Sequence, residues 1–252
     1  RIIKEMNGKT INGYVVAIDD TTSLILAQKH AAWSDIARKI AHEVKNPLTP
    51  IKLSAERIEK KFMNKEITNE DITLLTQTIS RQVDDIGKLV DEFSSFARMP
   101  DAEIKLDNLT KCLNDSYLLY SNTHRNIKMQ FNKNREDIYF QFDKMQLSQC
   151  FNNLIKNALE AVEKIPNPII TLNLKYKNKK IFIEFIDNGI GIDKDKVTKI
   201  FEPYFTTKSK GTGLGLSIVK RIIEDHGGKI IIEKNKNMAG TISTIVFDSN
   251  NA

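Results

Sequence analysis

The sequence contains little cysteine, little tryptophan and no long apolar run. Its 252 residues include two cysteines and one tryptophan. Two cysteines fit neither a disulfide framework nor a metal site, which predicts a reducing compartment. A membrane-spanning helix needs roughly 18 apolar residues, and no run approaches that length. The chain begins at Arg1 without methionine or signal peptide, so we expect a piece of a longer protein whose sensor and membrane anchor lie upstream.

No charge of one sign dominates the chain. The net charge of +6 comes from 38 basic and 32 acidic residues that are interspersed along the sequence. No basic block alternates with aromatic residues, as it would in a nucleic-acid-binding surface. The basic excess is interpreted as a solvated surface, and no nucleic-acid partner is expected. Length and composition fit two modest soluble domains with a connector.

The first 21 residues are interpreted as the end of a truncated domain. Residues 13–18, Gly-Tyr-Val-Val-Ala-Ile, are typical of a short apolar strand. Nothing N-terminal to this strand reads as a partner, and a lone strand is not stable by itself. We therefore expect residues 1–21 to be the C-terminal remnant of a domain that begins upstream.

Residues 22–100 predict two long amphipathic helices. Apolar residues recur at spacings of three and four on both sides of a polar break at residues 63–69. Within the break, Thr68 and Asp71 resemble a capping box that starts the second helix. The two apolar stripes comprise Ile36, Ile40, Val44, Leu48, Ile51, Ala55, Ile58 and Phe62, and Ile72, Leu75, Ile79, Val83, Ile86, Val90, Phe93 and Ala97. One hairpin cannot cover both stripes, so we expect an all-α helical hairpin that dimerises into a four-helix bundle.

After Pro100 short strands alternate with helices, which predicts an α+β sandwich over residues 101–252. Strands are expected near residues 103–107, 127–131, 138–142, 168–176, 180–187, 229–235 and 241–247. Helices are expected near residues 109–120, 143–164 and 213–226.

A first glycine motif follows the apolar strand at residues 181–186 and reads Asp187-Asn188-Gly189-Ile190-Gly191. A carboxylate at a strand end can accept a hydrogen bond from an exocyclic amine such as that of adenine. The glycines let the backbone approach a flat ring closely. Taken alone, however, the motif is explained better by a plain Asp-Gly turn.

A second glycine motif, at Gly211, Gly213 and Gly215, opens a predicted helix that contains Leu216. Free N–H groups at a helix N-terminus suit phosphate oxygens. Three glycines at this spacing are a weak signal alone, and they match neither a Walker loop nor a Rossmann turn.

The segment between the two glycine motifs has the composition of a mobile lid over a ligand. Residues 193–212 are polar and basic around an aromatic cluster at residues 201–205, which includes Phe205. Lys208 and Lys210 either meet phosphates or are solvated loop lysines; the sequence favours neither.

Asn153 and Asn157 are four residues apart on a predicted helix and so share one face. Asparagines on an otherwise apolar helix are unfavourable unless their amides are satisfied. A hydrated Mg²⁺ ion with phosphates would satisfy them. Asparagines that face water are the alternative.

Together the four motifs resemble the ATP-binding domain shared by histidine kinases, gyrase-type ATPases, MutL and the Hsp90 chaperones. The resemblance implies that Asp187 holds adenine, that the second glycine motif cradles phosphates and that Asn157 ligates Mg²⁺. The implied nucleotide-binding residues are Asn153, Asn157, Asp187, Gly189, Gly191, Phe205, Lys208, Gly211, Gly213, Gly215 and Leu216. Hydrolysing members carry Glu where this chain has Asn153. A neutral amide is a poor base for activating water, which favours phosphotransfer over hydrolysis.

Of the four histidines, His42 differs from the rest. At about 100° per residue it lies nearly opposite the apolar stripe, so its imidazole is expected to face solvent. A neutral imidazole offers a nitrogen lone pair for attack on phosphorus. His30, His124 and His226 are interpreted as structural.

Residues 41–50, Ala-His-Glu-Val-Lys-Asn-Pro-Leu-Thr-Pro, resemble the phosphoacceptor box of histidine kinases. The resemblance makes His42 the phosphoacceptor, Glu43 the general base that orients the ring, and Asn46 the residue that positions water for dephosphorylating the partner. Pro47 inside a helix costs about 3 kcal/mol or more. In the family, the resulting bend lets the ATP domain approach the histidine.

Residues 42–57 resemble the nitrogen-regulation sensor kinases of the NtrY type, and residues 13–22 the last strand of a PAS sensor domain leading into a signalling helix. The implied domains are 1–21, a PAS-like remnant; 22–100, signalling helix and dimerisation/histidine-phosphotransfer domain; and 101–252, the catalytic ATP-binding domain. Glu160 departs from the family, where many members carry Lys or Arg. Lys156 or a lid lysine is then the cation expected near the phosphates.

The resemblance implies a sensor histidine kinase that autophosphorylates His42 from Mg-ATP and passes the phosphoryl group to an aspartate of an NtrX-like response regulator. It further implies phosphatase activity toward that regulator and a homodimer. The chain is expected to be the cytoplasmic portion of a protein anchored in the inner membrane by upstream segments. The alternatives are a clamp ATPase of the gyrase or chaperone kind and an ATP-binding scaffold without kinase activity.

Overall fold

The structure, a computed structural model, describes residues 2–7, 10–16, 22–97, 102–207, 211–235 and 239–248. Side chains are described from Arg38 onward, with exceptions that include His42. The chain forms two compact units, residues 1–87 and 88–252. None of the described helices is long and apolar enough to cross a membrane.

The N-terminal residues form a β-hairpin. Strands β1 (Ile2–Asn7) and β2 (Thr10–Val16) pair antiparallel, with Ile2 opposite Val16 and an irregularity at Glu5. The expectation that this strand has no N-terminal partner is therefore wrong. The charged pair Lys4-Glu5 interrupts the apolar pattern of β1, which is why the sequence did not reveal it. Residues 17 and 18 of the predicted strand lie outside the described residues.

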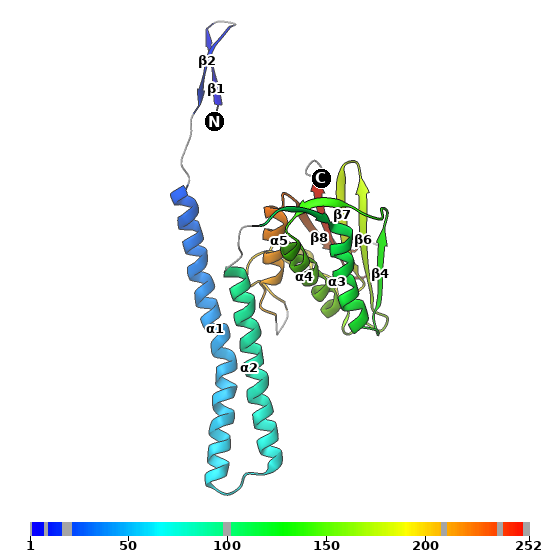
Figure 1. The fold of residues 1–252 in the computed structure, drawn as a ribbon. Coiled ribbons are helices and arrows are strands. Elements are labelled where there is room, and N and C mark those ends of the chain that lie inside the picture. Colours follow the sequence, from blue (N-terminus) through cyan, green and yellow to red (C-terminus); the bar gives the residue numbers. More distant parts are fainter. Residues whose placement is uncertain are drawn as a thin grey trace. The chain divides into compact units, whose positions relative to one another are not determined.

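Two long helices follow, α1 (Thr22–Met63) and α2 (Asn69–Ala97), drawn in Figure 1. The predicted capping box is present: the N–H of Asp71 donates to Thr68 Oγ1 at 3.1 Å, and the N–H of Thr68 donates to Asp71 Oδ2 at 3.3 Å. Lys61 Nζ reaches Asp71 Oδ1 at 2.6 Å and joins the two helices. This bond from Lys61 holds the pKa of Asp71 below its usual value.

α1 is continuous through Pro47 and Pro50. A proline nitrogen carries no hydrogen, so the carbonyls of Glu43 and Asn46 receive no bond from these positions. The hydroxyl of Thr49 donates to the Lys45 carbonyl at 3.3 Å, beside the interruption. The helix is thus weakened next to His42 without being broken.

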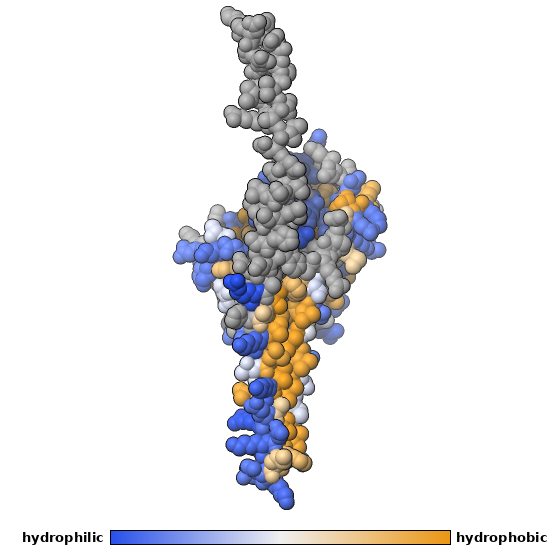
Figure 2. All heavy atoms as spheres, turned by 90° about the vertical axis from the view of Figure 1, so that its left-hand side faces the viewer, coloured by the Kyte–Doolittle hydropathy of each residue, from blue (hydrophilic) through white to orange (hydrophobic). Residues whose placement is uncertain are grey.

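Both predicted stripes remain largely uncovered in one chain. Figure 2 shows apolar side chains gathered in a band along the helical hairpin, bordered by polar ones. Leu75 is buried, with 8% exposed. The exposed large apolar side chains of the hairpin are Leu48, Leu53, Phe62, Met63, Ile72, Leu74, Val83 and Val90.

The second unit is the expected α+β sandwich. Its elements are β3 (Lys105–Asn108), α3 (Leu109–Thr123), β4 (Lys128–Lys133), β5 (Tyr139–Phe142), α4 (Lys144–Val162), β6 (Ile169–Lys177), β7 (Lys180–Asp187), η1 (Lys194–Lys196), α5 (Gly215–Asp225), β8 (Lys229–Lys234) and β9 (Thr241–Asp248). Five strands form one sheet in the order β4-β6-β7-β9-β8, and β3 pairs with β5 separately. Helices α3, α4 and α5 lie on one face of the sheet (Figure 1). Only β4 and β6 run parallel among the described strand pairs.

Alternating burial along the central strands builds the core. In β6 and β7 every second side chain points toward the helices and is buried. Burying each of these large apolar side chains stabilises the fold by roughly 1.5–3 kcal/mol. They are Ile170, Leu172 and Leu174 of β6, and Ile181, Ile183 and Phe185 of β7.

The two cysteines are free thiols on α3 and α4. Cys112 and Cys150 are both buried. Burial raises the pKa of each thiol, so both stay protonated and unreactive. This agrees with the prediction that they form no disulfide.

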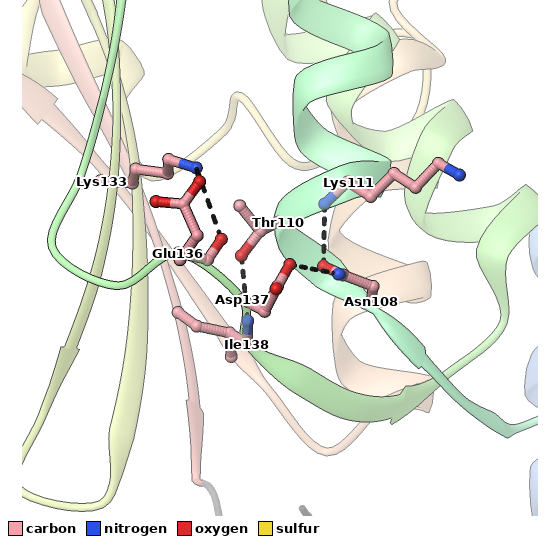
Figure 3. A network of polar contacts seen from close by, with 7 residues as sticks. All are labelled: Asn108, Thr110, Lys111, Lys133, Glu136, Asp137 and Ile138. Atoms are coloured by element: carbon pink, nitrogen blue, oxygen red, sulfur yellow. Dashed lines mark hydrogen bonds and ion pairs between the residues drawn. The ribbon is translucent and has the colours of Figure 1, made fainter.

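A polar network attaches the β4–β5 connection to the start of α3 (Figure 3). Asn108 caps α3 by accepting from the N–H of Lys111 at 3.0 Å, and its amide donates to Asp137. Thr110 Oγ1 accepts from the N–H of Ile138 at 3.1 Å. These bonds fix the first turn of α3 against the connection that leads into β5.

Asp143 and His226 join α4 to α5. The Asp143 carboxylate caps α4 through the N–H groups of Met145 and Gln146, and its second oxygen accepts from the N–H of Glu103 at 2.9 Å. Asp143 N–H donates to His226 Nε2 at 2.9 Å, and His226 Nδ1 lies 2.7 Å from the Ile222 carbonyl. A backbone N–H only donates and a carbonyl only accepts, so Nε2 of His226 is the acceptor and Nδ1 is the donor.

Replacing Asp143 with Ala is expected to lower the free energy of unfolding by about 1–2 kcal/mol, because α4 loses its cap. Burial raises the pKa of Asp143, but the bonds from Gln146, Glu103 and Met145 outweigh it and leave the pKa below its usual value. The stabilisation is therefore complete above the unfolded-state pKa of about 3.9 and is lost as pH falls through the folded-state pKa.

Urea unfolding at pH 7 and at acid pH measures the difference in the free energy of unfolding between wild type and Asp143→Ala. Asp115→Ala is the control, because Asp115 is an exposed residue inside α3. The capping role would be contradicted if Asp143→Ala had the same free energy of unfolding as wild type at pH 7. It would also be contradicted if the loss of stability in this variant grew toward acid pH.

Candidate functional site

Asp187 is the last residue of β7, the central strand of the five-stranded sheet. Its side chain is buried, with 6% exposed. Oδ1 accepts hydrogen bonds from the N–H of Gly189 at 2.8 Å and from the N–H of Thr241 at 3.2 Å. These donors belong to the backbone of two different segments, so they fix the direction in which the carboxylate points.

The glycines after Asp187 are required by their surroundings. A Cβ on Gly189 would lie 2.5 Å from the carbonyl oxygen of Ala161 in α4. The N–H of Ile190 donates to the same oxygen at 3.2 Å. Gly191 has a φ of +74°, which residues with a side chain rarely adopt. The motif is thus pressed against α4 by direct backbone contact.

Asn188, between the aspartate and the first glycine, has a structural role. Its Oδ1 accepts from the N–H of Ile169 at 2.8 Å, and its amide donates to the carbonyl of Asn167 at 2.7 Å. The side chain therefore fixes the start of β6 rather than facing a ligand.

α4 carries the two predicted asparagines on the side that meets this motif. Asn157 precedes Ala161 by one helical turn, and Asn153 precedes Asn157 by another, so the three share one face. Both asparagines are half-buried. Lys156 and Glu160 on the same helix are exposed. Asn157 and Asp187 therefore lie on two elements that touch through Ala161 and Gly189.

The second glycine motif is locked to the aromatic segment before it. Gly213 has a φ of +70°, and a Cβ there would lie 2.5 Å from the backbone carbon of Tyr204. The N–H of Tyr204 donates to the Gly213 carbonyl at 2.9 Å. Tyr204 is itself buried, and burial raises its pKa to about 12. The two segments form one unit held by backbone contacts.

α5 begins at Gly215, the last glycine of this motif. Leu214 occupies the cap position without a capping side-chain hydrogen bond in the described structure. First-turn N–H groups that no side chain caps are available to an anion, and the helix dipole favours negative charge there. Leu216 and Gly211 are half-buried beside this end of the helix.

The predicted lid is partly folded. Ile200 is buried, and Phe205 donates its N–H to the Glu202 carbonyl at 3.1 Å. Lys220 of α5 lies 5.7 Å from the centre of the Phe201 ring, a cation–π contact. Lys208 and Lys210, predicted near phosphates, lie outside the described residues. The mobility of the lid stays a prediction.

The described residues offer oxygen donors for a hydrated magnesium ion rather than a closed metal cage. They contain no cluster of three His, Cys, Asp or Glu side chains placed to hold a metal. The amide oxygen of Asn157 is a donor of the kind that Mg²⁺ accepts when phosphates and water supply the other ligands. The residues present therefore fit Mg²⁺ bound together with a nucleotide.

His42, Glu43 and Asn46 lie on α1, in the other compact unit. Glu43 is half-buried and Asn46 is exposed. The side chain of His42 lies outside the described structure, so its predicted exposure stays a prediction. The three residues share a helix whose backbone hydrogen bonding is weakened by Pro47 and Pro50.

Sequence reasoning missed three residues that shape the site. Ala161 supplies the backbone that Gly189 touches, while Thr241 and the preceding Gly240 contact Asp187. Ala161 and Gly240 contribute backbone alone, which leaves no side-chain signature. The contacts also join residues far apart in the chain, such as Asp187 and Thr241.

Two family models match the chain. Residues 142–251 match the histidine kinase-, DNA gyrase B- and HSP90-like ATPase family, and residues 32–102 match the His Kinase A phospho-acceptor domain. The catalytic domain of histidine kinase ThkA is 34% identical to this chain with a TM-score of 0.53, over 58% of this chain and 96% of that domain. The chain belongs to the sensor histidine kinases.

Other histidine kinases are similar over more of the chain. The nitrogen regulation protein NtrY of Azorhizobium caulinodans is 41% identical over 91% of this chain, which spans 30% of that protein's length. Histidine kinase ThkA in its complex with the response regulator protein TrrA matches the whole of this chain, with a TM-score of 0.74 and 26% identity. The match covers 75% of that ThkA chain. The two-domain histidine-kinase architecture expected from the sequence is confirmed, and the similarity to NtrY extends over most of this chain.

Gly213→Ala is expected to destabilise this histidine kinase. The new side chain meets the Tyr204 backbone and forces a left-handed conformation, which alone costs on the order of 1–3 kcal/mol. Gly215→Ala is the matched control, because a Cβ there meets no described atom within 4 Å. Differential scanning calorimetry compares the two. Equal melting temperatures for both variants would show that Tyr204 and Gly213 are not locked together.

Proposed function

We propose that this chain binds Mg-ATP at the end of β7 and transfers the γ-phosphoryl group to His42. The observation that supports this best is the buried Asp187 carboxylate, which is aimed by two backbone amides and precedes a glycine motif packed against α4. A directed carboxylate recognises the exocyclic amine of adenine, while the uncapped start of α5 suits phosphate oxygens.

In the proposed site each residue has a distinct part. Asp187 accepts a hydrogen bond from adenine, and Gly189 and Gly191 let the backbone approach the ring. Gly211, Gly213 and Gly215, with Leu216 in the first turn of α5, present N–H groups to the phosphates. Asn157 and the phosphate oxygens hold Mg²⁺, which when bound neutralises the charge on the phosphates. Asn153, Phe205 and Lys208 complete the proposed nucleotide contacts.

The proposed acceptor is a neutral imidazole nitrogen of His42. Its lone pair forms a bond to the γ-phosphorus while the bond from phosphorus to the bridging oxygen breaks, and ADP leaves with that electron pair. Glu43 orients the ring as the general base. Asn153 supplies an amide where a hydrolysing site needs a carboxylate, so the site does not activate water.

We further propose a homodimer that serves a response regulator. The exposed apolar stripes of α1 and α2 require a cover that a second hairpin would supply (Figure 2). Phosphoryl transfer would then continue to an aspartate of an NtrX-like regulator, and Asn46 would position water for its dephosphorylation. Anchoring at the inner membrane would depend on segments outside this chain.

Asp187→Asn is expected to weaken ATP binding about tenfold or more, because an amide replaces a charged hydrogen-bond acceptor. Isothermal titration calorimetry with Mg-ATP measures the change. Asp225→Asn, in an exposed ion pair of α5, is the control and leaves the affinity unchanged. Equal affinities for wild type and Asp187→Asn would refute the adenine assignment.

His42→Gln is expected to bind ATP normally and to take up no phosphoryl group. Incubation with γ-labelled ATP and Mg²⁺ followed by electrophoresis tests this, with His124→Gln as the control that remains labelled. Label retained by His42→Gln would place the acceptor elsewhere. Sustained ATP turnover without phosphoprotein would instead indicate a clamp ATPase, and ATP binding with neither would indicate a scaffold.

A further inference from the structure

Gly240, the residue before β9, touches the Asp187 motif through its backbone. Gly240 has a φ of +116°. A Cβ at this position would overlap the carbonyl oxygen of Asp187 and would lie 2.8 Å from the Cα of Asn188. No side chain fits in that space, so the contact depends on glycine at residue 240.

The carbonyl oxygen of Gly240 is fixed by a backbone hydrogen bond. It accepts a hydrogen bond at 3.0 Å from the N–H of Asn235, the residue that follows β8. Asn235 is buried, with 5% exposed. The same carbonyl oxygen lies 3.3 Å from the place where a Cβ of Gly191 would stand. Gly240 therefore contacts both the first and the last residue of the Asp187–Gly191 motif.

Thr241 links Gly240 to the carboxylate. Strands β7 and β9 pair up to Ile186 and Ile242. One residue further, the N–H of Thr241 donates to Asp187 Oδ1 at 3.2 Å. Gly240 and Thr241 share a peptide bond that is planar and rigid, so any displacement of Gly240 moves this donor.

We propose that Gly240 and the amide of Thr241 are positioning elements that aim the Asp187 carboxylate and thereby set the preference of the site for adenine. They act through Asp187 without needing to touch the nucleotide. This inference rests on the proposed binding of adenine by Asp187, and it extends the recognition site to two residues that lie more than 50 residues further along the chain.

The test compares the affinity of the whole chain for Mg-ATP with that for purine riboside triphosphate, which lacks the exocyclic amine. Wild type is expected to prefer ATP. In Gly240→Ala the preference is expected to fall about tenfold, the effect of losing one hydrogen bond to a charged group. Gly227→Ala is the matched control: Gly227 also has positive φ, at +69°, but a Cβ there meets no described atom within 4 Å.

The ratio of the two affinities separates positioning from folding. Unfolded protein lowers both apparent affinities by the same factor, so it leaves the ratio unchanged. If Gly240→Ala does not fold at all, Thr241→Pro removes the donating N–H at the first residue of β9, where proline is tolerated. This variant is expected to lose the preference in the same way.

The outcomes distinguish the two claims. The positioning role would be overturned if Gly240→Ala kept the wild-type ratio of the two affinities. The same holds for Thr241→Pro if that variant has to be used instead. In either case the proposed ATP site would still stand. A wild-type protein that binds both triphosphates equally would overturn the adenine assignment and the positioning role together. Loss of the preference in the tested variant, with its retention in Gly227→Ala, supports the inference.

Discussion

The carboxylate of Asp187 is held at the end of the central strand by the amides of Gly189 and Thr241, and the proposed nucleotide site depends on this carboxylate. β7 has strands on both sides, so its end is fixed by the whole sheet. α4 packs on that sheet and reaches the motif through Ala161, one turn beyond Asn157. The carboxylate that we propose for adenine and the amide that we propose for Mg²⁺ are thereby held by elements that pack against each other.

Direct backbone contact is the means by which separate segments are joined. Gly189 meets Ala161, Gly213 meets Tyr204, and Gly240 meets Asp187, each at a distance that a side chain would prevent. Backbone contacts are short and have few rotatable bonds, so they hold the segments more firmly than long side chains do. This explains why the glycines of the two motifs are structural requirements as well as openings for a ligand.

The features that could be predicted from the sequence are those that depend on residues close together in the chain. The apolar period and the capping box placed the polar break at 63–69 between helices that end at Met63 and begin at Asn69. Glycine and asparagine spacing identified the motifs. The first strand of the N-terminal hairpin was missed because its charges hide the apolar pattern. The role of Gly240 was missed because it arises only when β9 pairs with β7, a contact that no local pattern records.

His42 belongs to a helix of the first unit, and the residues proposed to bind the nucleotide belong to the second. The division of labour between them, one unit presenting a nucleophile and the other holding ATP, is the central functional claim. Mass spectrometry of the wild-type chain after incubation with Mg-ATP, under conditions that preserve acid-labile phosphate, tests it most directly. We expect a single phosphoryl group on His42 that is lost in acid and kept in alkali. Phosphate on serine, threonine or another histidine, or none despite bound ATP, would contradict the claim.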